Sequence, residues 1–248
     1  MIIDISYYNK VTNWHDVKSS VEGVILRMGY SGYASGKQVI DKKYYDNLAA
    51  CQQLKIPVGV YFFPQSITHK EAEQEAAFIL NNLPDEYPLG VWLDSEIADV
   101  KTKKGRADSL NVYKRTQFLI IIINILRAQG IDCGVYASKS WLEHQLDVPA
   151  LGDTPIWVAQ YNKQCTYKGA YKLWQYTSKA SVTGISGGVD ASVKTIEDNK
   201  PVHEYDEELL SAADVFANRV IRGDFGQGHE VRKNSIYELI RKRVNDII

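Results

Sequence analysis

Short apolar runs alternate with segments of helical periodicity along most of the chain. Apolar runs of four to eight residues are typical of buried strands. We expect strands at residues 1–6, 24–30, 56–64, 89–96, 131–138, 155–161, 171–177 and 188–190. Apolar positions at helical spacing predict helices over residues 44–55, 72–83, 110–129 and 140–146. Alternation of strands and helices indicates a mainly parallel sheet.

Local signals define the ends of two of these helices. Thr68 and Glu71 form a capping box in front of the helix at 72–83. Gly130 is placed to end the helix at 110–129 as a C-cap. The isoleucine run 120–123 favours a strand by its β-propensity, so the centre of that helix is less firmly indicated than its ends.

The fold class predicted from this pattern is α/β. About eight strands within roughly 200 residues favour a closed, irregular (β/α) TIM-like barrel. Its set of helices is reduced, because the helical segments shrink or vanish in the second half. An open doubly wound sheet is the alternative. No Gly-x-Gly-x-x-Gly follows a strand, and the turn at residues 29–32 lacks the lysine of a phosphate loop.

Acidic residues mark the ends of several predicted strands. Asp94 and Glu96 lie two apart, so on a strand they share a face. Two acids on one face repel when both are ionised, and one then keeps a proton, as general acid catalysis requires. An isolated Asp-x-Glu is more often a polar strand end. In a barrel, however, the strand ends meet at one mouth, and Asp4 and Asp190 also lie at strand ends.

Aromatic residues accompany these acids. They are Tyr61, Phe63, Tyr136, Trp157, Tyr161 and Trp174. Aromatic rings stack on sugars, but they also fill cores. For Trp157 and Trp174 the pattern is as compatible with a core position as with a sugar site.

The composition of the 248 residues narrows the choice of partners. A net charge of −1 gives no reason to expect nucleic acid or an anionic membrane. The apolar stretch 118–126 is too short to span a bilayer. No basic leader precedes an apolar core at the start, so we expect synthesis in the cytoplasm without a signal peptide.

We expect neither a metal nor a cofactor. The histidines are scattered, and the three cysteines fit no metal motif, so free thiols are expected. These residues are His15, His69, His144, His203, His229, Cys51, Cys133 and Cys165.

The residues at these strand ends resemble the glycoside hydrolase family 25 lysozymes, which include many phage endolysins. Trp14 falls where that family commonly has a tryptophan. The matching motifs are residues 4–6 (DIS), 23–30 (GVILRMGY), 59–63 (GVYFF), 93–96 (LDSE), 157–161 (WVAQY), 174–178 (WQYTS) and 188–190 (GVD). The resemblance covers about residues 1–196, and the order and spacing of the motifs make it specific.

The resemblance implies cleavage of the β-1,4 bond between N-acetylmuramic acid and N-acetylglucosamine in peptidoglycan. It implies Glu96 as general acid and Asp94 as its partner at the reacting sugar, with Asp4 and Asp190 in the same mouth. The six aromatic residues would shape the sugar subsites. Either Asp94 or the substrate's own N-acetyl group, oriented by Asp94, could stabilise the reacting centre. Release to the cell wall would need a phage holin.

The C-terminal part shows a separate pattern. Residues 197–208 are polar and acidic and indicate a linker, and residues 209–248 suggest a small all-α module. Residues 220–228 (VIRGDFGQG) and 244–245 (VN) resemble the CW_7 cell-wall-binding repeat. That resemblance implies binding of muropeptide, with Arg222, Asp224 and Arg232 as candidate contacts. A module of about 40 residues is near the lower limit for independent folding, so support from the barrel or self-association is expected.

Two other functions compete with this interpretation. A family 18 chitinase requires Asp-x-x-Asp-x-Asp-x-Glu, but Trp92 and Leu89 occupy the two earlier acidic positions. A catalytically silent peptidoglycan-binding protein would be expected to lack at least one of the acids, and all four are present.

Overall fold

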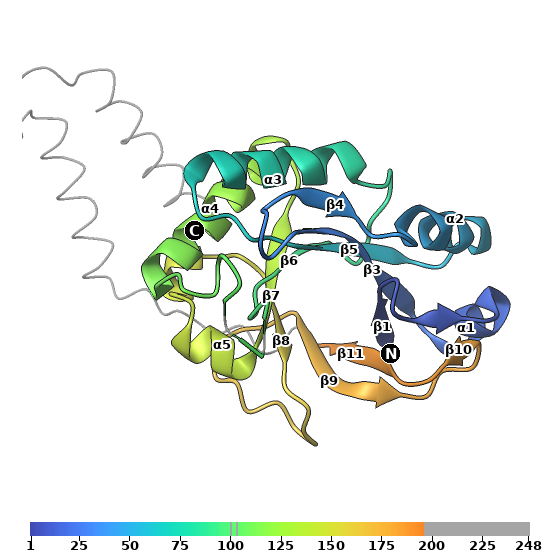
Figure 1. Ribbon diagram of the computed structural model, residues 1–248. Coiled ribbons are helices and arrows are strands. Elements are labelled where there is room, and N and C mark those ends of the chain that lie inside the picture. Colours follow the sequence, from blue (N-terminus) through green and yellow to red (C-terminus); the bar gives the residue numbers. More distant parts are fainter. Residues whose placement is uncertain (100, 103, 196–248) are drawn as a thin grey trace, which may run out of the picture. The chain divides into compact units, whose positions relative to one another are not determined.

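The computed structural model describes residues 1–99, 101–102 and 104–195, and eight strands of this part close into a barrel (Figure 1). The ring closes because β1 pairs with β3 on one edge and with β11 on the other. The strands are, in order around the ring, β1 (Ile2–Ile5), β3 (Gly23–Ser31), β5 (Val58–Phe63), β6 (Val91–Asp94), β7 (Cys133–Ser138), β8 (Ile156–Ala159), β9 (Leu173–Ala180) and β11 (Val189–Lys194). The closed ring confirms the predicted irregular TIM-like barrel and excludes the open doubly wound sheet.

One barrel strand departs from the predicted parallel arrangement. The strands from β1 through β9 pair in parallel around the ring, whereas β11 is antiparallel to both of its neighbours. Residues 181–188 join β9 to β11. A parallel crossover needs a dozen or more residues, so this connection is too short to return β11 in the parallel sense.

The helices surround the outside of the barrel (Figure 1). The main ones are α2 (Tyr44–Leu54), α3 (His69–Asn82) and α4 (Val112–Ala128), and α5 (Lys139–His144) is shorter. All four were predicted. Helix α4 confirms that tertiary burial overrides the β-propensity of its isoleucines, since Ile122 and Ile123 are fully buried.

Several short elements were not predicted. Strand β4 pairs with the C-terminal end of β3, and β2 pairs with β10. These elements are α1 (Trp14–Ser20), β2 (Lys10–Val11), β4 (Gln38–Ile40), β10 (Ile185–Ser186) and the 3₁₀ turn Pro149–Leu151. Most are only two or three residues long, so they carry little periodicity.

The predicted caps are confirmed. The side chain of Thr68 accepts a hydrogen bond from the Glu71 amide, and Gly130 has a left-handed φ of +75° after α4. The predicted strand 89–96 is shorter in the structure, because Gly90 adopts a φ of +86° and forms a turn to Tyr87. Strand β6 therefore begins at Val91.

Pleating divides each strand between two apolar regions. Outward side chains join the main core beneath the helices, while inward side chains fill the barrel. The barrel interior consists of Ile2, Ile25, Leu89, Trp92, Trp157 and Leu173, with Tyr61 and Tyr136 packed against them. Trp92 and Trp157 meet edge to face, with ring centroids 5.6 Å apart. These rings form the floor beneath the inward residues at the strand ends.

The cysteines agree with the predicted free thiols. No disulfide joins them; Cys51 and Cys133 are buried, and Cys165 is half-buried. Among the described residues, no helix is long and apolar enough to cross a membrane.

We expect Trp157→Ala to lower the free energy of unfolding by about 3–5 kcal/mol, because it empties a large volume inside the barrel. Its indole N–H also donates to Ser192 Oγ at 3.0 Å, so the substitution leaves that hydroxyl unpaired. Urea denaturation measures the effect. The exposed aromatic Tyr113 provides the control, and Tyr113→Ala should change stability by less than about 0.5 kcal/mol. Equal effects of the two substitutions would contradict this placement of Trp157.

Candidate active site

Four acidic residues come together at one end of the barrel because of strand parity. Asp4 and Asp94 point inward from β1 and β6, and each is only 7% exposed. Asp190 of β11 lies directly opposite Asp4 in the antiparallel register. Glu96 follows β6 by two residues, and its side chain is exposed. The structure thus brings together all four acids that were predicted to share a mouth.

Burial raises the pKa of every acid in this group, and repulsion between the acids raises it further for Asp4, Asp94 and Glu96. Desolvation is the main cause of the raised pKa of Asp4, followed by the charge of Asp190. The pKa of Asp94 is also well above its usual range, first through desolvation and then through Glu96 and Asp4. Desolvation and Asp190 raise the pKa of Glu96, although its carboxyl reaches solvent. The group therefore binds protons more tightly than separate carboxylates would.

Gln175 connects this acidic group to two tyrosines. Its side-chain amide donates to Asp4 Oδ2 at 2.9 Å. Its carbonyl oxygen accepts hydrogen bonds from the hydroxyls of Tyr136 and Tyr161, at 2.9 and 3.0 Å. Gln175 was not a predicted site residue, although it lies inside the matched WQYTS motif. Gln175 lies between Trp174 and Tyr176 on β9, and both of these aromatic side chains pack on the outer core. The inward position of Gln175 could be recognised only once the pleat of the strand was known.

Four of the six predicted aromatic residues border the acids. Tyr61 faces the interior, and the charges of Asp4 and Asp94 contribute to its raised pKa after desolvation. Tyr136 and Tyr161 reach the site through Gln175. Phe63, the last residue of β5, is half-buried and shares the inward parity of Tyr61.

For the two remaining aromatic residues, Trp157 and Trp174, the structure favours the core position that the sequence left open. Trp157 is 2% exposed and lies in the barrel interior, where it has no free face for a ligand. Trp174 has the opposite parity to Gln175 on β9, so it packs on the outer core, and its indole N–H donates to the Gln160 carbonyl at 2.8 Å. Both tryptophans support the walls of the site and do not line it.

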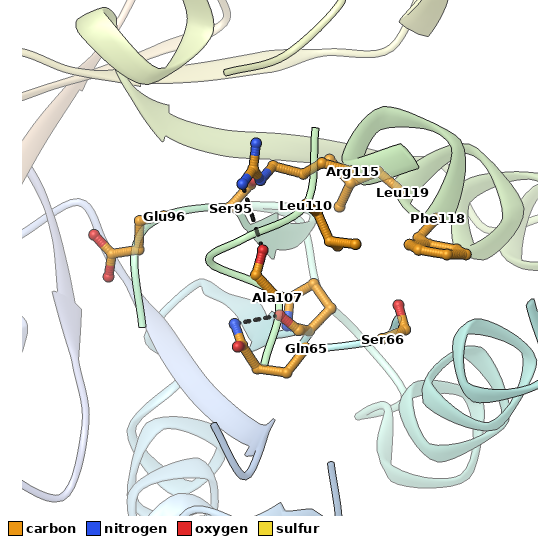
Figure 2. Close-up of a pocket in the computed structure, with 10 residues that line it drawn as sticks. Gln65, Ser66, Ser95, Glu96, Ala107, Leu110, Arg115, Phe118 and Leu119 are labelled. Atoms are coloured by element: carbon orange, nitrogen blue, oxygen red, sulfur yellow. Dashed lines mark hydrogen bonds between the residues drawn. The ribbon is translucent and has the colours of Figure 1, made fainter. Parts of the chain in front are cut away.

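A second layer fixes the chain next to Glu96. The indole N–H of Trp141 donates to Ser95 Oγ at 3.1 Å, and the Arg115 guanidinium lies 4.8 Å from the Trp141 ring centroid. Arg115 in turn donates to the carbonyls of Ala107 and Asp108. Ser95 and Arg115 line a pocket on the α4 side of Glu96, and Figure 2 shows the Glu96 carboxyl pointing away from the other lining side chains. These contacts hold in place the loop that carries Glu96 at the mouth of the barrel.

Some predicted features lie outside the described residues. They are the linker 197–208, the module 209–248 and its candidate contacts Arg222, Asp224 and Arg232. Within the described ranges, no group of three or more histidine, cysteine or acidic side chains could hold a metal ion.

The fold and this acidic mouth define a β/α-barrel protein with carboxylates at the ends of its strands. The model of the glycosyl hydrolases family 25 matches residues 3–185. The chain therefore belongs to glycosyl hydrolase family 25. No curated protein matches it.

Solved structures of similar proteins agree with this family. The modular autolysin LytC from Streptococcus pneumoniae is 29% identical with a TM-score of 0.68, and the match covers 78% of this chain and 46% of LytC. The CTP1L endolysin is 28% identical with a TM-score of 0.59, covering 79% of this chain and 66% of that protein. This chain thus matches less than two thirds of either protein. The bacterial lysozyme from Streptomyces coelicolor shares the fold at 20% identity, with a TM-score of 0.61 and coverage of 79% and 92%.

The acidic group makes stability depend on pH in a defined direction. The pKa of Asp4 is higher in the folded state than in the unfolded chain, so its contribution is fully present at low pH and is lost as pH rises through the folded pKa. We expect Asp4→Asn to gain stability relative to the wild type as pH rises from about 5 to about 8. Urea denaturation at both values measures this. The exposed Asp85→Asn variant is the control, and the same pH-independent difference for both variants would contradict the prediction.

Proposed function

We propose that this protein is an N-acetylmuramidase, which hydrolyses the β-1,4 bond between N-acetylmuramic acid and N-acetylglucosamine in bacterial peptidoglycan. The observation that carries the proposal is the acidic mouth, in which Glu96 and Asp94 lie together with raised pKa values. Glycoside hydrolysis requires one protonated and one ionised carboxyl beside the scissile bond. The four acids of this mouth supply both states.

Glu96 is the proton donor in this proposal. The side chain of Glu96 is exposed, whereas Asp4 and Asp94 are buried, so the Glu96 carboxyl can reach the glycosidic oxygen. Its raised pKa keeps it protonated closer to neutral pH. Asp94 stabilises positive charge at the reacting sugar from deeper in the mouth, acting through the substrate's N-acetyl group. Asp4 and Asp190 line the side of the mouth that β1 and β11 form.

The similar proteins support this choice of substrate. A structure of LytC is known in complex with a synthetic peptidoglycan ligand, and the other similar proteins include an endolysin and a bacterial lysozyme. The aromatic residues of the mouth fit a sugar polymer, because their rings present apolar faces to the apolar faces of sugars. Tyr61, Phe63, Tyr136 and Tyr161 would shape those subsites.

The chemical identity of the cleaved ends tests the function. Purified peptidoglycan is digested, reduced with borohydride and separated for mass spectrometry. A muramidase leaves reduced muramic acid at the new ends. Reduced glucosamine at those ends would replace the proposal with a glucosaminidase, and no new reducing ends would favour a binding protein without activity.

Glu96→Gln should lower kcat by at least about a hundredfold, because the amide cannot donate the catalytic proton. The fold should remain, since the side chain is exposed. Release of reducing ends from peptidoglycan measures activity, and thermal denaturation measures folding. The matched control is Glu73→Gln on α3, whose side chain is 53% exposed. Near-normal hydrolysis by the Glu96 variant would reject the assignment.

For the C-terminal part we propose a CW_7-like module that binds muropeptide through Arg222, Asp224 and Arg232 and that associates with a second copy of itself. The support is the sequence resemblance of residues 220–228 and 244–245. A protein that lacks residues 206–248 should sediment less with purified cell walls, while it still hydrolyses soluble glycan fragments. Equal loss of binding and hydrolysis would mean that the deleted segment stabilises the barrel instead.

A further inference from the structure

Three tyrosines lie on the rim of the barrel beside the acidic mouth. Tyr7 and Tyr8 follow β1 directly, a few residues after Asp4. Tyr30 lies near the C-terminal end of β3, the strand that pairs in parallel with β1. The carboxyl ends of parallel barrel strands lie at one end of the barrel. The three tyrosines are therefore at the same end of the barrel as the acids.

The guanidinium of Arg27 lies close to all three tyrosine rings. Its central carbon lies 5.1, 5.3 and 5.5 Å from the ring centroids of Tyr7, Tyr8 and Tyr30. The rings of Tyr7 and Tyr8 also contact each other, with centroids 3.9 Å apart and an angle of 33° between their planes. Because Arg27 Nε donates to Asp41 Oδ2 at 2.7 Å, the cation stays in place and attracts the aromatic faces. The three rings thus form one cluster around a fixed charge.

Hydrogen bonds also fix the backbone that carries the first two rings. The Tyr7 amide donates to Asp41 Oδ2 at 3.1 Å, and the Ser6 amide donates to Asn9 Oδ1 at 2.9 Å. The Lys43 ammonium group donates to the Asn9 carbonyl at 2.8 Å. The turn after β1 therefore holds its tyrosines in one arrangement before any ligand binds, so a ligand loses little binding free energy to ordering them.

Tyr8 is open to solvent in spite of these contacts. It is 74% exposed, whereas Tyr7 and Tyr30 are half-buried. A lone exposed aromatic residue needs no explanation. Here, however, the exposed ring is supported by two other rings and a fixed cation. Such a ring offers its apolar face to the apolar face of a sugar and its hydroxyl to the sugar hydroxyls.

The tyrosine cluster is continuous with the acidic mouth. Arg27 lies on β3 two residues after Ile25, a residue of the barrel interior, so the two side chains share the inner face of the strand. In the sheet register Arg27 pairs with Tyr61 of β5, which borders the acids. On the neighbouring strand, Asp4 precedes the turn that carries the other two tyrosines. A polymer bound across the acids can therefore extend over the cluster on the β1 and β3 side.

We propose that Tyr7, Tyr8 and Tyr30 form an additional sugar subsite, in which the exposed ring of Tyr8 stacks on a pyranose ring of the glycan strand beyond the two sugars at the cleaved bond. This subsite rests on the proposed function, because its ligand is the same β-1,4-linked chain of N-acetylated sugars. It binds substrate and touches no reacting atom. It favours long glycan strands over short fragments, since only a long fragment reaches from the acids to Tyr8.

The dependence of hydrolysis on glycan length tests the subsite in the full chain. Glycan strands are freed of their stem peptides with an amidase and separated by length. In the wild type, kcat/KM should rise with length until the fragment reaches Tyr8. In Tyr8→Ala the ratio of kcat/KM for long over short fragments should fall about fivefold, mainly through KM, because one stacking contact is lost.

Matched variants separate stacking from other effects. Tyr8→Phe keeps the ring, so its length ratio should stay near the wild-type value, and a loss equal to that of Tyr8→Ala would overturn the stacking role. Tyr113→Ala removes a tyrosine that is 66% exposed at the start of α4, and it should leave the ratio unchanged. Tyr8→Gln provides a second variant without the ring if thermal denaturation shows that Tyr8→Ala is unstable. An unchanged ratio in the folded variant without the ring would overturn the subsite.

A binding measurement that needs no turnover distinguishes the subsite from the proposed function. Peptide-free glycan fragments are titrated calorimetrically into Glu96→Gln, with and without Tyr8→Ala. The added substitution should weaken the binding of long fragments about fivefold and that of short fragments less. Equal affinity of the two proteins for long fragments overturns the subsite even if digestion shows a muramidase. A length-dependent loss supports the subsite even if digestion yields reduced glucosamine ends.

Discussion

The repulsion among four carboxylates in one buried mouth is the constraint on which the site depends. Asp4 and Asp94 are almost entirely buried, and Asp190 and Glu96 lie beside them. Full ionisation of all four would place several like charges in a medium of low dielectric constant. The group must therefore retain protons or recruit opposite charge. Gln175 stabilises Asp4 by a hydrogen bond.

The four acids come together because side chains alternate between the inside and the outside of the barrel along each strand. Each strand places its outward residues in a large apolar core beneath the helices and its inward residues in a small aromatic core. The outer core holds the strands in place, while the inner floor of Trp92 and Trp157 excludes water beneath the acids. The antiparallel β11 completes the arrangement, because its register sets Asp190 directly opposite Asp4. Stability is thus supplied by one face of each strand and chemistry by the other.

The sequence predicted the barrel and all four acids, because apolar runs and strand-end carboxylates are local signals. It could not predict which tryptophan faces inward. Trp157 and Trp174 both stand in matched motifs, yet the closed barrel buries one inside and places the other on the outer core. Gln175 was missed for the same reason. Its partners lie on β1, β7 and the segment after β8, and only closure of the ring brings them together.

The most direct measurement of this constraint is the proton content of the acidic mouth. Carbon NMR of carboxyl-labelled wild-type protein, with the signals assigned by single amide substitutions, follows the four carboxyls from about pH 3 to about pH 9. We expect at least one of them to keep its proton above about pH 6, because burial raises all four pKa values and repulsion raises three of them further. If all four titrate near the ordinary carboxyl value of about 4, the acids do not share protons, and the division of roles between Glu96 and Asp94 is wrong.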